Sequence, residues 1–455
     1  MAVDTIKRLL FRSFRTTPEM PERFRRRFTL AGIFVWCAMA FALTLGADTA
    51  RTMGYQVFTV LGVIMLISLC STFRFKPRLR LRRQMPRFGT VQQPLRYSIW
   101  LHNDGKHAEK NLILIERQLD PRPSFKEFIH AREPGEEKRN AWDRFVGYHR
   151  FRWLMERKRG ARIREMPLPD LPPGRETDVT VEIQPLRRGR LNLVTSILAR
   201  PDPFGLVKAL HRVAHPDSVL ILPNRYTLPP IDLPGQMKYQ QGGVNQASSV
   251  GESEEFISLR DYRPGDPLRN IHWRSFARTG RPIVREFQDE FFVRTALVLD
   301  TFGVDLDVFE EAVAVAASFA VALDTQEALL DLLFVGTDAY CFTVGRGVGQ
   351  TELVLEVLAD VQTSPEKPFS DLTKLVLGHG PQVSGCVCVL LSWDEPRREF
   401  VGKLLSMQVP TLVLVLVPKG ADTRLDLGPM RASPERFKVI PIDRIQETLA
   451  TLGQR

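Results

Sequence analysis

Two long runs without a charged residue stand near the start of the chain. The first lies between Arg27 and Asp48 and the second between Arg51 and Arg74. Each run has about the length that an α-helix needs to cross a hydrocarbon core of roughly 30 Å. A second run so soon after the first argues against a cleaved signal peptide. The pattern predicts a hairpin of two transmembrane helices over residues 28–73, with a buried helix pair of a soluble protein as the alternative.

The basic residues beside these runs predict how the hairpin is oriented. Lys and Arg crowd residues 1–27 and 74–87, where Arg83 is one of those expected to face the inner leaflet, whereas the loop that joins the two runs carries only Arg51. Flanks that stay in the cytoplasm are rich in Lys and Arg, and short loops that cross the membrane are poor in them. We therefore expect a multi-pass membrane protein with a basic cytoplasmic N-terminus over residues 1–27, a cytoplasmic C-terminus and contact with membrane lipid.

Short apolar–polar alternations separated by turn residues follow over residues 74–225. They predict a small antiparallel β-sandwich. A basic insertion, residues 121–173, interrupts this pattern, and its aromatic residues at 145–153 stand among Arg and Lys. Such a mixture is typical of an amphipathic helix on a membrane surface. A solvated helix packed on the sandwich explains it equally well.

The pattern changes again in the C-terminal half. Residues 226–294 contain a linker rich in Pro, Gly, Gln and Ser and then a densely charged segment. Over residues 295–455, apolar Val and Leu runs alternate with helical patterns, which is typical of parallel strands covered by helices on both faces. We predict a doubly wound α/β domain there, whose strands include residues 328–335 and 411–417. Ligands of such domains bind at the carboxyl ends of the strands, which points to Asp300 and residues 393–394.

Composition narrows the classes of function. The 455 residues include 63 Lys and Arg against 52 Asp and Glu, a net charge of +11. The excess lies mostly in the first part of the chain, so membrane topology and attraction to anionic lipid explain it better than binding of nucleic acid, for which the sequence has no motif. The five cysteines form neither a disulfide framework nor a zinc-site pattern. A reducing compartment is therefore expected.

The signature segment, residues 251–290, packs acids, arginines, one His and one Trp around turn residues. No core-forming periodicity requires such a density of charge, so we look there for function or for a highly specified polar structure. The residues that carry its pattern are Glu255, Phe256, Leu259, Arg260, Tyr262, Gly265, Asp266, Arg269, Ile271, His272, Trp273, Ala277, Arg278, Val284, Arg285, Glu286 and Phe287. The motifs RRGR at 187–190 and DPFGL at 202–206 precede it.

This pattern, with its upstream motifs and the order of the predicted parts, resembles the domain-of-unknown-function 58 family. The resemblance covers most of the chain, and the insertion at 121–173 is the chief departure from it. It implies a protein of the bacterial inner (plasma) membrane whose C-terminal part is a von Willebrand factor type A-like domain. It also implies a partner, because members are often encoded beside an AAA+ ATPase of the MoxR type.

The resemblance raises the question of an ion site. Domains of the von Willebrand type commonly bind a divalent ion through an Asp-x-Ser-x-Ser turn, and here Phe302 and Val304 stand where the serines would be. Hard cations such as Mg²⁺ require oxygen ligands. Asp300 and Asp394 could still hold Mg²⁺, with Thr301 or water completing the shell. The alternative is that Asp300 caps a helix or accepts backbone N–H groups.

The charged side chains of the signature segment allow two interpretations. They form bidentate ion pairs that lock the segment onto the α/β sheet, or some of them stay open to a partner protein or an acidic ligand. The charged residues concerned are Glu255, Arg260, Asp266, Arg269, Arg278 and Arg285, and the predicted interaction residues also include Tyr262, Gly265, His272 and Trp273.

From the predicted topology we expect a membrane-anchored, cytoplasm-facing module for protein interaction or assembly, and not an enzyme, and the resemblance implies that it works with the ATPase. His is the usual general acid or base near neutral pH, but nothing in the sequence completes a catalytic set around His272. The glycines at 345–349 lack the Lys of a phosphate-binding loop. The alternative is a hydrolase or metal-dependent enzyme that uses His272, Asp300 and Asp394. A third possibility is binding of anionic lipid or polymer by the insertion.

Overall fold

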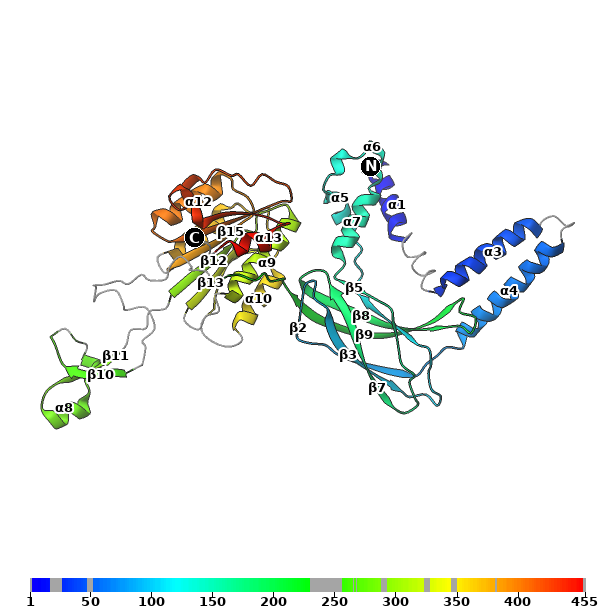
Figure 1. Ribbon diagram of the computed structural model, residues 1–455, viewed down its shortest axis with the longest axis horizontal. Coiled ribbons are helices and arrows are strands. Elements are labelled where there is room, and N and C mark those ends of the chain that lie inside the picture. Colours follow the sequence, from blue (N-terminus) through cyan, green and yellow to red (C-terminus); the bar gives the residue numbers. More distant parts are fainter. Residues whose placement is uncertain are drawn as a thin grey trace. The chain divides into compact units, whose positions relative to one another are not determined.

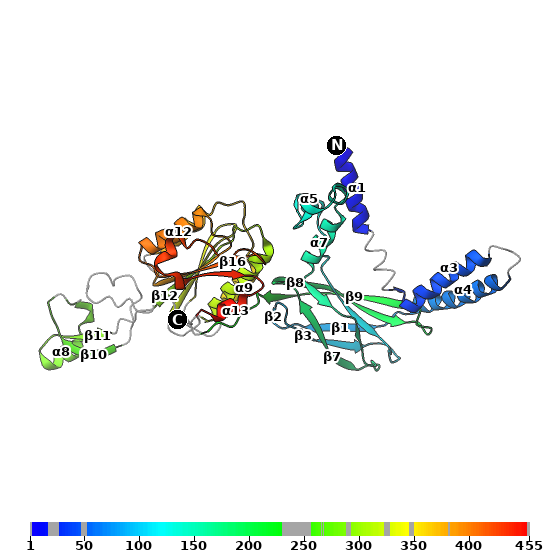
Figure 2. The ribbon, with the colours of Figure 1, turned by 45° about the horizontal axis from the view of Figure 1, so that its top comes forward.

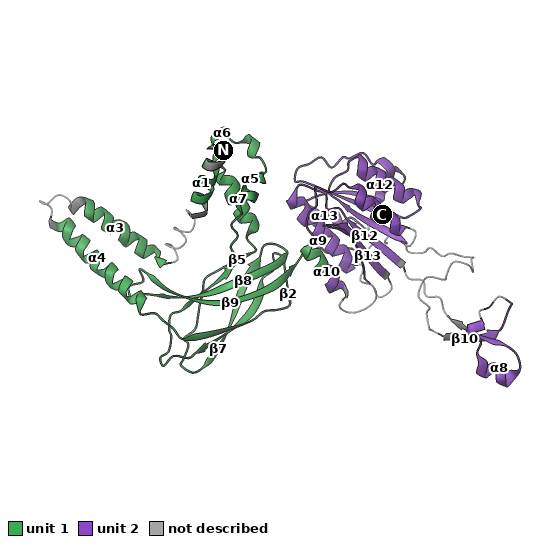
Figure 3. Ribbon diagram, turned by 180° about the vertical axis from the view of Figure 1, so that it is seen from behind, with its two compact units in different colours: residues 1–224, 356–360 green, residues 225–355, 361–455 purple. Residues whose placement is uncertain are grey.

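The computed structural model describes residues 2–16, 27–46, 52–229, 256–264, 266, 268–287, 293–322, 328–344, 350–380 and 383–452. The protein is of mixed α/β class with several sheets. It divides into two compact units (Figure 3). The first comprises Met1–Asn224 and Glu356–Asp360, and the second comprises Arg225–Leu355 and Val361–Arg455.

The two apolar runs form the helices α3 (Leu30–Gly46) and α4 (Thr52–Phe73), which lie side by side (Figures 1 and 2). Within the described part of the chain, one helical stretch is long and apolar enough to cross a membrane, Met53–Phe73, with a mean hydropathy of 2.0. The apolar stretch of α3, Leu30–Thr44, is shorter. Association with a membrane is thus indicated by one helix, and the two-helix hairpin stays a prediction.

Two sheets of the first unit enclose one hydrophobic core, as expected for a sandwich. One sheet has the order β1-β3-β7-β5 and the other β2-β9-β8-β4-β6. Inward-facing side chains of both sheets, such as Ile99 and Leu193, are fully buried between them. The strands are β1 (Leu79–Gln84), β2 (Phe88–Thr90), β3 (Leu95–Asn103), β4 (Ile113–Gln118), β5 (Ala161–Ile163), β6 (Met166–Pro167), β7 (Glu176–Pro185), β8 (Gly189–Pro201) and β9 (Lys208–Leu222).

An ion pair lies inside this sandwich. Arg83 alternates with exposed neighbours on β1 and points inward, where its Nη2 donates to Glu116 Oε2 at 2.7 Å and to Ser196 Oγ at 3.0 Å. Both side chains of the Arg83–Glu116 pair are at most 1% exposed. Burial raises the pKa of Glu116, while Arg83 and Ser196 counteract that shift. Placing Arg83 among the basic residues that face lipid was therefore wrong, because its charge is used within the fold.

The basic insertion forms short helices and packs against the N-terminal helix. Ser124 accepts from the backbone of Glu127 in a capping box that begins α5. Phe128 and Phe151 of the insertion, both buried, surround Phe11 of α1 with ring centroids 5.3 and 5.8 Å away. The apolar face of the insertion is thus covered by α1, which neither sequence interpretation foresaw. The helices are α1 (Ala2–Thr16), α5 (Phe125–His130), η1 (Glu136–Lys138), α6 (Ala141–Val146) and α7 (Tyr148–Lys158).

The C-terminal part is a parallel sheet with one antiparallel edge strand. Its order is β14-β13-β12-β15-β16-β17, and only the β13–β14 pair is antiparallel. Helices α11 and α12 bury apolar side chains on one face of the sheet, and α9 packs on β12, β15 and β16. The elements are β12 (Val293–Leu299), α9 (Leu306–Ala322), β13 (Ala328–Val335), β14 (Ala339–Val344), α10 (Gln350–Asp360), α11 (Ser370–His379), β15 (Gly385–Leu390), α12 (Glu395–Ser406), β16 (Thr411–Val417), η4 (Gly428–Ala432), η5 (Pro434–Arg436), β17 (Phe437–Pro441) and α13 (Ile445–Ala450).

Candidate functional site

The sheet of the second unit has a switch point between β12 and β15. The chain runs from β12 to β13 on one side and returns to β15 on the other. At such a point two loops diverge at the carboxyl edge of the sheet, which is where α/β folds place their ligands. Asp300 directly follows β12, and Asp394 follows β15 as the N-cap of α12. The two residues that the sequence singled out therefore meet at this edge.

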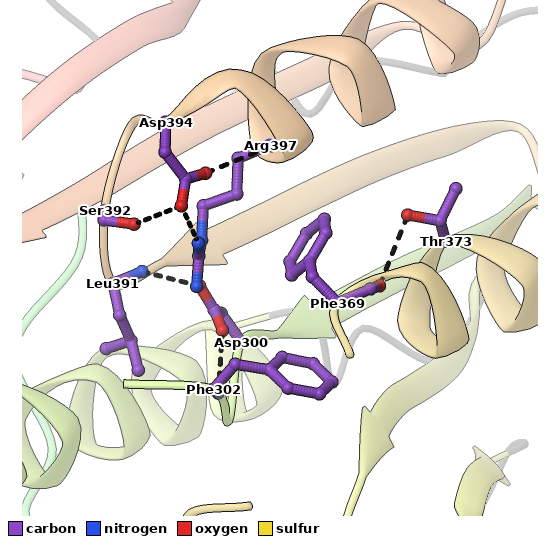
Figure 4. A network of polar contacts seen from close by, with 8 residues as sticks. All are labelled: Asp300, Phe302, Phe369, Thr373, Leu391, Ser392, Asp394 and Arg397. Atoms are coloured by element: carbon purple, nitrogen blue, oxygen red, sulfur yellow. Dashed lines mark hydrogen bonds and ion pairs between the residues drawn. The ribbon is translucent and has the colours of Figure 1, made fainter. Parts of the chain in front are cut away.

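Arg397 connects these two carboxylates (Figure 4). Its Nε donates to Asp300 Oδ2 at 2.6 Å, and its Nη1 donates to Asp394 Oδ2, also at 2.6 Å. The carboxylate of Asp300 also accepts the backbone N–H of Phe302 at 2.9 Å and that of Leu391 at 3.0 Å. We call this set of contacts the Arg397 network.

The Arg397 network is closed off from water on the side of Asp300. Asp300 is fully buried and the side chain of Arg397 is 7% exposed, while Asp394 is 47% exposed. The ring of Phe369 stacks on the guanidinium, with its centroid 4.7 Å from the Arg397 Cζ atom. A buried carboxylate is tolerated only when it is paired and hydrogen-bonded, and these contacts meet that condition. Asp300 thus takes the second of the two roles considered above, as an acceptor of backbone N–H groups.

The residues at this edge do not fit a divalent ion. Mg²⁺ requires several oxygen ligands, but the guanidinium of Arg397 already lies between the two carboxylates and donates to both. The prediction of an ion at Asp300 and Asp394 is not supported by this geometry.

The signature segment folds into a small hairpin-based module, residues 256–287, which we call the signature module. Strands β10 (Phe256–Asp261) and β11 (Ile283–Phe287) pair antiparallel, and η2 (Leu268–Asn270) and α8 (Trp273–Thr279) lie between them. Ile271 and Val284 form its small buried interior. Helix α8 ends at Thr279 and is capped by Gly280, whose φ of 66° is the left-handed conformation that favours glycine.

One predicted ion pair of the signature segment is formed and holds the turn of this module. Arg260 binds Asp266 through two parallel hydrogen bonds of 2.7 and 2.9 Å, and the backbone N–H of Arg263 donates to the same carboxylate at 2.8 Å. The Arg260 hydrogen bond, with that of Arg263, lowers the pKa of Asp266 to about 2. Tyr262 joins the hairpin through its backbone N–H, which donates to the Pro282 carbonyl at 2.9 Å.

The other predicted residues of the module lie on its surface. Trp273 is 62% exposed and packs edge-on against Phe276, with ring centroids 6.0 Å apart. Arg269, Arg278 and Arg285 are exposed. Arginine and aromatic side chains are enriched at protein–protein interfaces, so this surface has the composition of an interaction site. Glu255, Gly265 and the glycines at 345–349 lie outside the described residues.

His272 is used within the module. Its Nδ1 lies 2.6 Å from Ser275 Oγ, one turn into α8, and its backbone N–H donates to the Ile283 carbonyl at 2.8 Å. Within the described residues, no hydrogen bond or ion pair joins His272 to Asp300 or Asp394. The enzyme alternative, which would use His272 together with Asp300 and Asp394, stays a hypothesis.

Sequence reasoning missed Arg397, the residue that organises the carboxyl edge. A signal was present, since Arg397 follows Asp394 by three positions in a helix, a spacing at which side chains meet. The contact with Asp300 could not be read in the same way, because it joins residues that are 97 positions apart.

The signature module and the first part of the α/β sheet are similar to one known protein family. A family model described as "Protein of unknown function DUF58" matches residues 258–392. The "Uncharacterized protein YeaD" of Bacillus subtilis (strain 168) is 27% identical over 143 residues, which cover 31% of this chain and 35% of that protein. The match thus spans about a third of the relative's length.

Solved structures show only weak likeness. The CARDB domain of the PF1109 protein from Pyrococcus furiosus is 12% identical, with 32% of this chain and 89% of that chain covered and a TM-score of 0.18. A Salmonella alpha-2-macroglobulin mutant is 14% identical, with 35% and 8% covered and a TM-score of 0.17. Likeness at this level carries no argument about function.

Proposed function

We propose that this protein is a membrane-anchored, cytoplasm-facing interaction module that docks an AAA+ ATPase of the MoxR type. Helix α4 and the basic flanks of residues 28–73 support the anchoring and the cytoplasmic orientation, in the bacterial inner membrane with both termini cytoplasmic. The parallel sheet with one antiparallel edge strand and helices on its faces is in keeping with a von Willebrand type A-like domain. No step of this function requires catalysis by the chain itself.

The observation that carries the proposal is the surface of the signature module. Its 32 residues include seven Arg and only three acidic residues, a net charge of +4. Among these, six arginines are exposed: Arg263, Arg269, Arg274, Arg278, Arg281 and Arg285. Leu268 and Trp273 stand among them, 67% and 62% exposed. Such a surface fits a protein partner that offers an acidic rim around an apolar pocket.

The internal contacts of the module explain why this surface stays exposed. The hairpin has only two strands, and among its described side chains two apolar ones, Ile271 and Val284, are buried, while Trp273 is 62% exposed. The turn of the module is stabilised by the ion pair between Arg260 and Asp266. A surface that keeps large apolar side chains exposed in this way marks an interaction site.

Affinity purification of the tagged full-length protein from membranes in mild detergent tests the proposal. We expect the ATPase to co-purify with the wild type and to be lost from Arg274→Glu/Arg278→Glu, because charge reversal opposes an acidic partner. Recovery should fall as salt rises, since exposed charges are screened within about 10 Å at 0.1 M. The matched control is Arg132→Glu/Arg152→Glu, two exposed arginines of the insertion. Equal recovery of the ATPase by the signature-module variant and the wild type would contradict the proposal.

A further inference from the structure

We propose that Arg397 is the resident cation of the α/β domain, so that its carboxyl edge is complete without a metal ion. In this arrangement one guanidinium replaces a divalent ion as the positive charge shared by the loops after β12 and β15. The inference is independent of the docking function, because it concerns a different part of the second unit.

The first step of the argument is the charge balance at the edge. Asp300 is fully buried, and a buried ionised carboxylate needs a counter-charge close by. Within the described residues, the cation that contacts Asp300 is Arg397, at 2.6 Å. The same guanidinium contacts Asp394 at 2.6 Å, so one positive charge lies between two negative ones. The buried charge of Asp300 is thereby balanced, and the remaining negative charge lies on Asp394, which is 47% exposed to water.

The second step is the geometry of bridging. A divalent ion at this edge would join oxygen atoms supplied by the loops after β12 and β15. Here the planar guanidinium does the same, since its Nε and Nη1 donate to carboxylates from two different loops. Phe369, which precedes α11, covers the guanidinium face, so the cation is also held by a third segment. Arginine suits this position because its charge is permanent and its donors are fixed in one plane.

The third step is how the cation is delivered. Asp394 caps α12, and Arg397 stands three residues later, in the first turn of the same helix. The Asp394 carboxylate accepts the Arg397 backbone N–H at 3.3 Å as well as its side-chain Nη1. Folding of this helix turn therefore places the guanidinium at the edge of the sheet. No entry of an ion from solution is needed.

The inference has a direct consequence for a variant without the guanidinium. Arg397→Ala leaves Asp300 and Asp394 near one another with no cation between them, and it opens the space that the side chain occupied. Two carboxylates that have lost their counter-charge attract a hard divalent cation. We expect the dissociation constant of Arg397→Ala for Mn²⁺ to be at least about tenfold lower than that of the wild type. In the wild type, we expect no saturable Mn²⁺ binding that depends on Asp300.

The test uses Mn²⁺ as the probe and the full-length protein in detergent. Binding is followed by electron paramagnetic resonance of free Mn²⁺ and by calorimetry, and the thermal midpoint is measured with Mn²⁺ and with a chelator. The matched control is Arg398→Ala, the neighbouring arginine, which pairs with Glu395 at the surface and should gain no site. The double variant Asp394→Asn/Arg397→Ala should lose the Mn²⁺ binding that Arg397→Ala gains.

Each result decides for or against the inference. Gain of Mn²⁺ binding by Arg397→Ala, absent from Arg398→Ala and from the double variant, supports it. Saturable Mn²⁺ binding by the wild type that Asp300→Asn abolishes would overturn it, as would a well-folded Arg397→Ala with no gain. If Arg397→Ala does not fold, the test rests on the wild-type protein. A wild-type thermal midpoint that neither chelator nor Mn²⁺ changes supports Arg397 as the resident cation. A midpoint that Mn²⁺ raises in the wild type but not in Asp300→Asn refutes the inference.

Discussion

Replacing Arg83 by Ala is expected to destabilise the sandwich by about 3–5 kcal/mol, the usual cost of removing one partner from a buried ion pair. Glu116 would be left at 1% exposure without its cation. Ser196, which donates to Glu116 at 2.9 Å, offers one hydrogen bond but no charge. A loss of this size lowers the thermal midpoint of a unit of this length by roughly 10 °C. Differential scanning fluorimetry of the full-length protein in detergent measures it.

The pH dependence of this variant has a definite sign. Burial raises the pKa of Glu116 in the folded state, and loss of Arg83 removes a group that lowers it. A carboxyl whose pKa is higher when folded binds more protons when folded, so stability falls as pH rises through that pKa. The free energy of unfolding that Arg83→Ala loses relative to the wild type should therefore be larger at pH 8 than at pH 5.

Two further variants separate the buried pair from charge in general. Arg96→Ala removes an exposed partner, since the Arg96 and Glu182 side chains of the same sandwich are 70% and 55% exposed. This substitution should lower the free energy of unfolding by no more than about 1 kcal/mol. Arg83→Met/Glu116→Leu replaces both charges with apolar groups and should recover most of the lost stability. An Arg83→Ala protein as stable as Arg96→Ala would show that the buried pair does not contribute as described.

Replacing Trp273 by Ala is expected to weaken partner binding at least about 30-fold. Trp and Arg are the residues whose truncation most often costs 2 kcal/mol or more at an interface, and each 1.4 kcal/mol is a factor of ten in affinity. Trp273 is 62% exposed among exposed arginines and has Phe276 as its neighbour, so it can enter a pocket on a partner with little loss of internal packing. Biolayer interferometry with the full-length protein in detergent and the purified ATPase measures the dissociation constant.

A second exposed tryptophan provides the control for this substitution. Trp142 of the insertion is 72% exposed, and its ring lies 6.4 Å from that of Phe145. It matches Trp273 in exposure and in having an aromatic neighbour, but it lies outside the signature module. Trp142→Ala should leave the affinity within about twofold of the wild type. Equal losses from the two variants would indicate a general effect of removing surface tryptophan.

The α/β part was the most predictable from sequence. The apolar runs predicted at 328–335 and 411–417 are confirmed as β13 and β16 with the same bounds, because continuous Leu and Val runs are typical of strands buried on both faces. Strand β14 was missed because its exposed residues lack such a run. Strand β17 was missed as well; it is short and only partly buried.

Polar contacts between distant residues limited what the sequence could predict. Arg83 was grouped with the lipid-facing arginines because its neighbours are basic, and only the alternation of β1 reveals that it points inward. Asp300 and Asp394 were correctly expected at one edge, since the carboxyl ends of parallel strands lie together. The identity of the cation between them depends on the rotamer of Arg397, which no spacing rule specifies. The packing of α1 on the insertion likewise depends on Phe11 meeting aromatic rings more than 100 positions away.

Site-specific photo-crosslinking in intact membranes tests the docking surface most directly. A benzophenone amino acid is placed at position 273 of the full-length protein, and the same group at position 142 serves as the matched control. We predict a crosslink from position 273 to an AAA+ ATPase, identified by mass spectrometry, and none from position 142. If position 273 yields no ATPase adduct, or if both positions yield it equally, the signature module is not the docking surface.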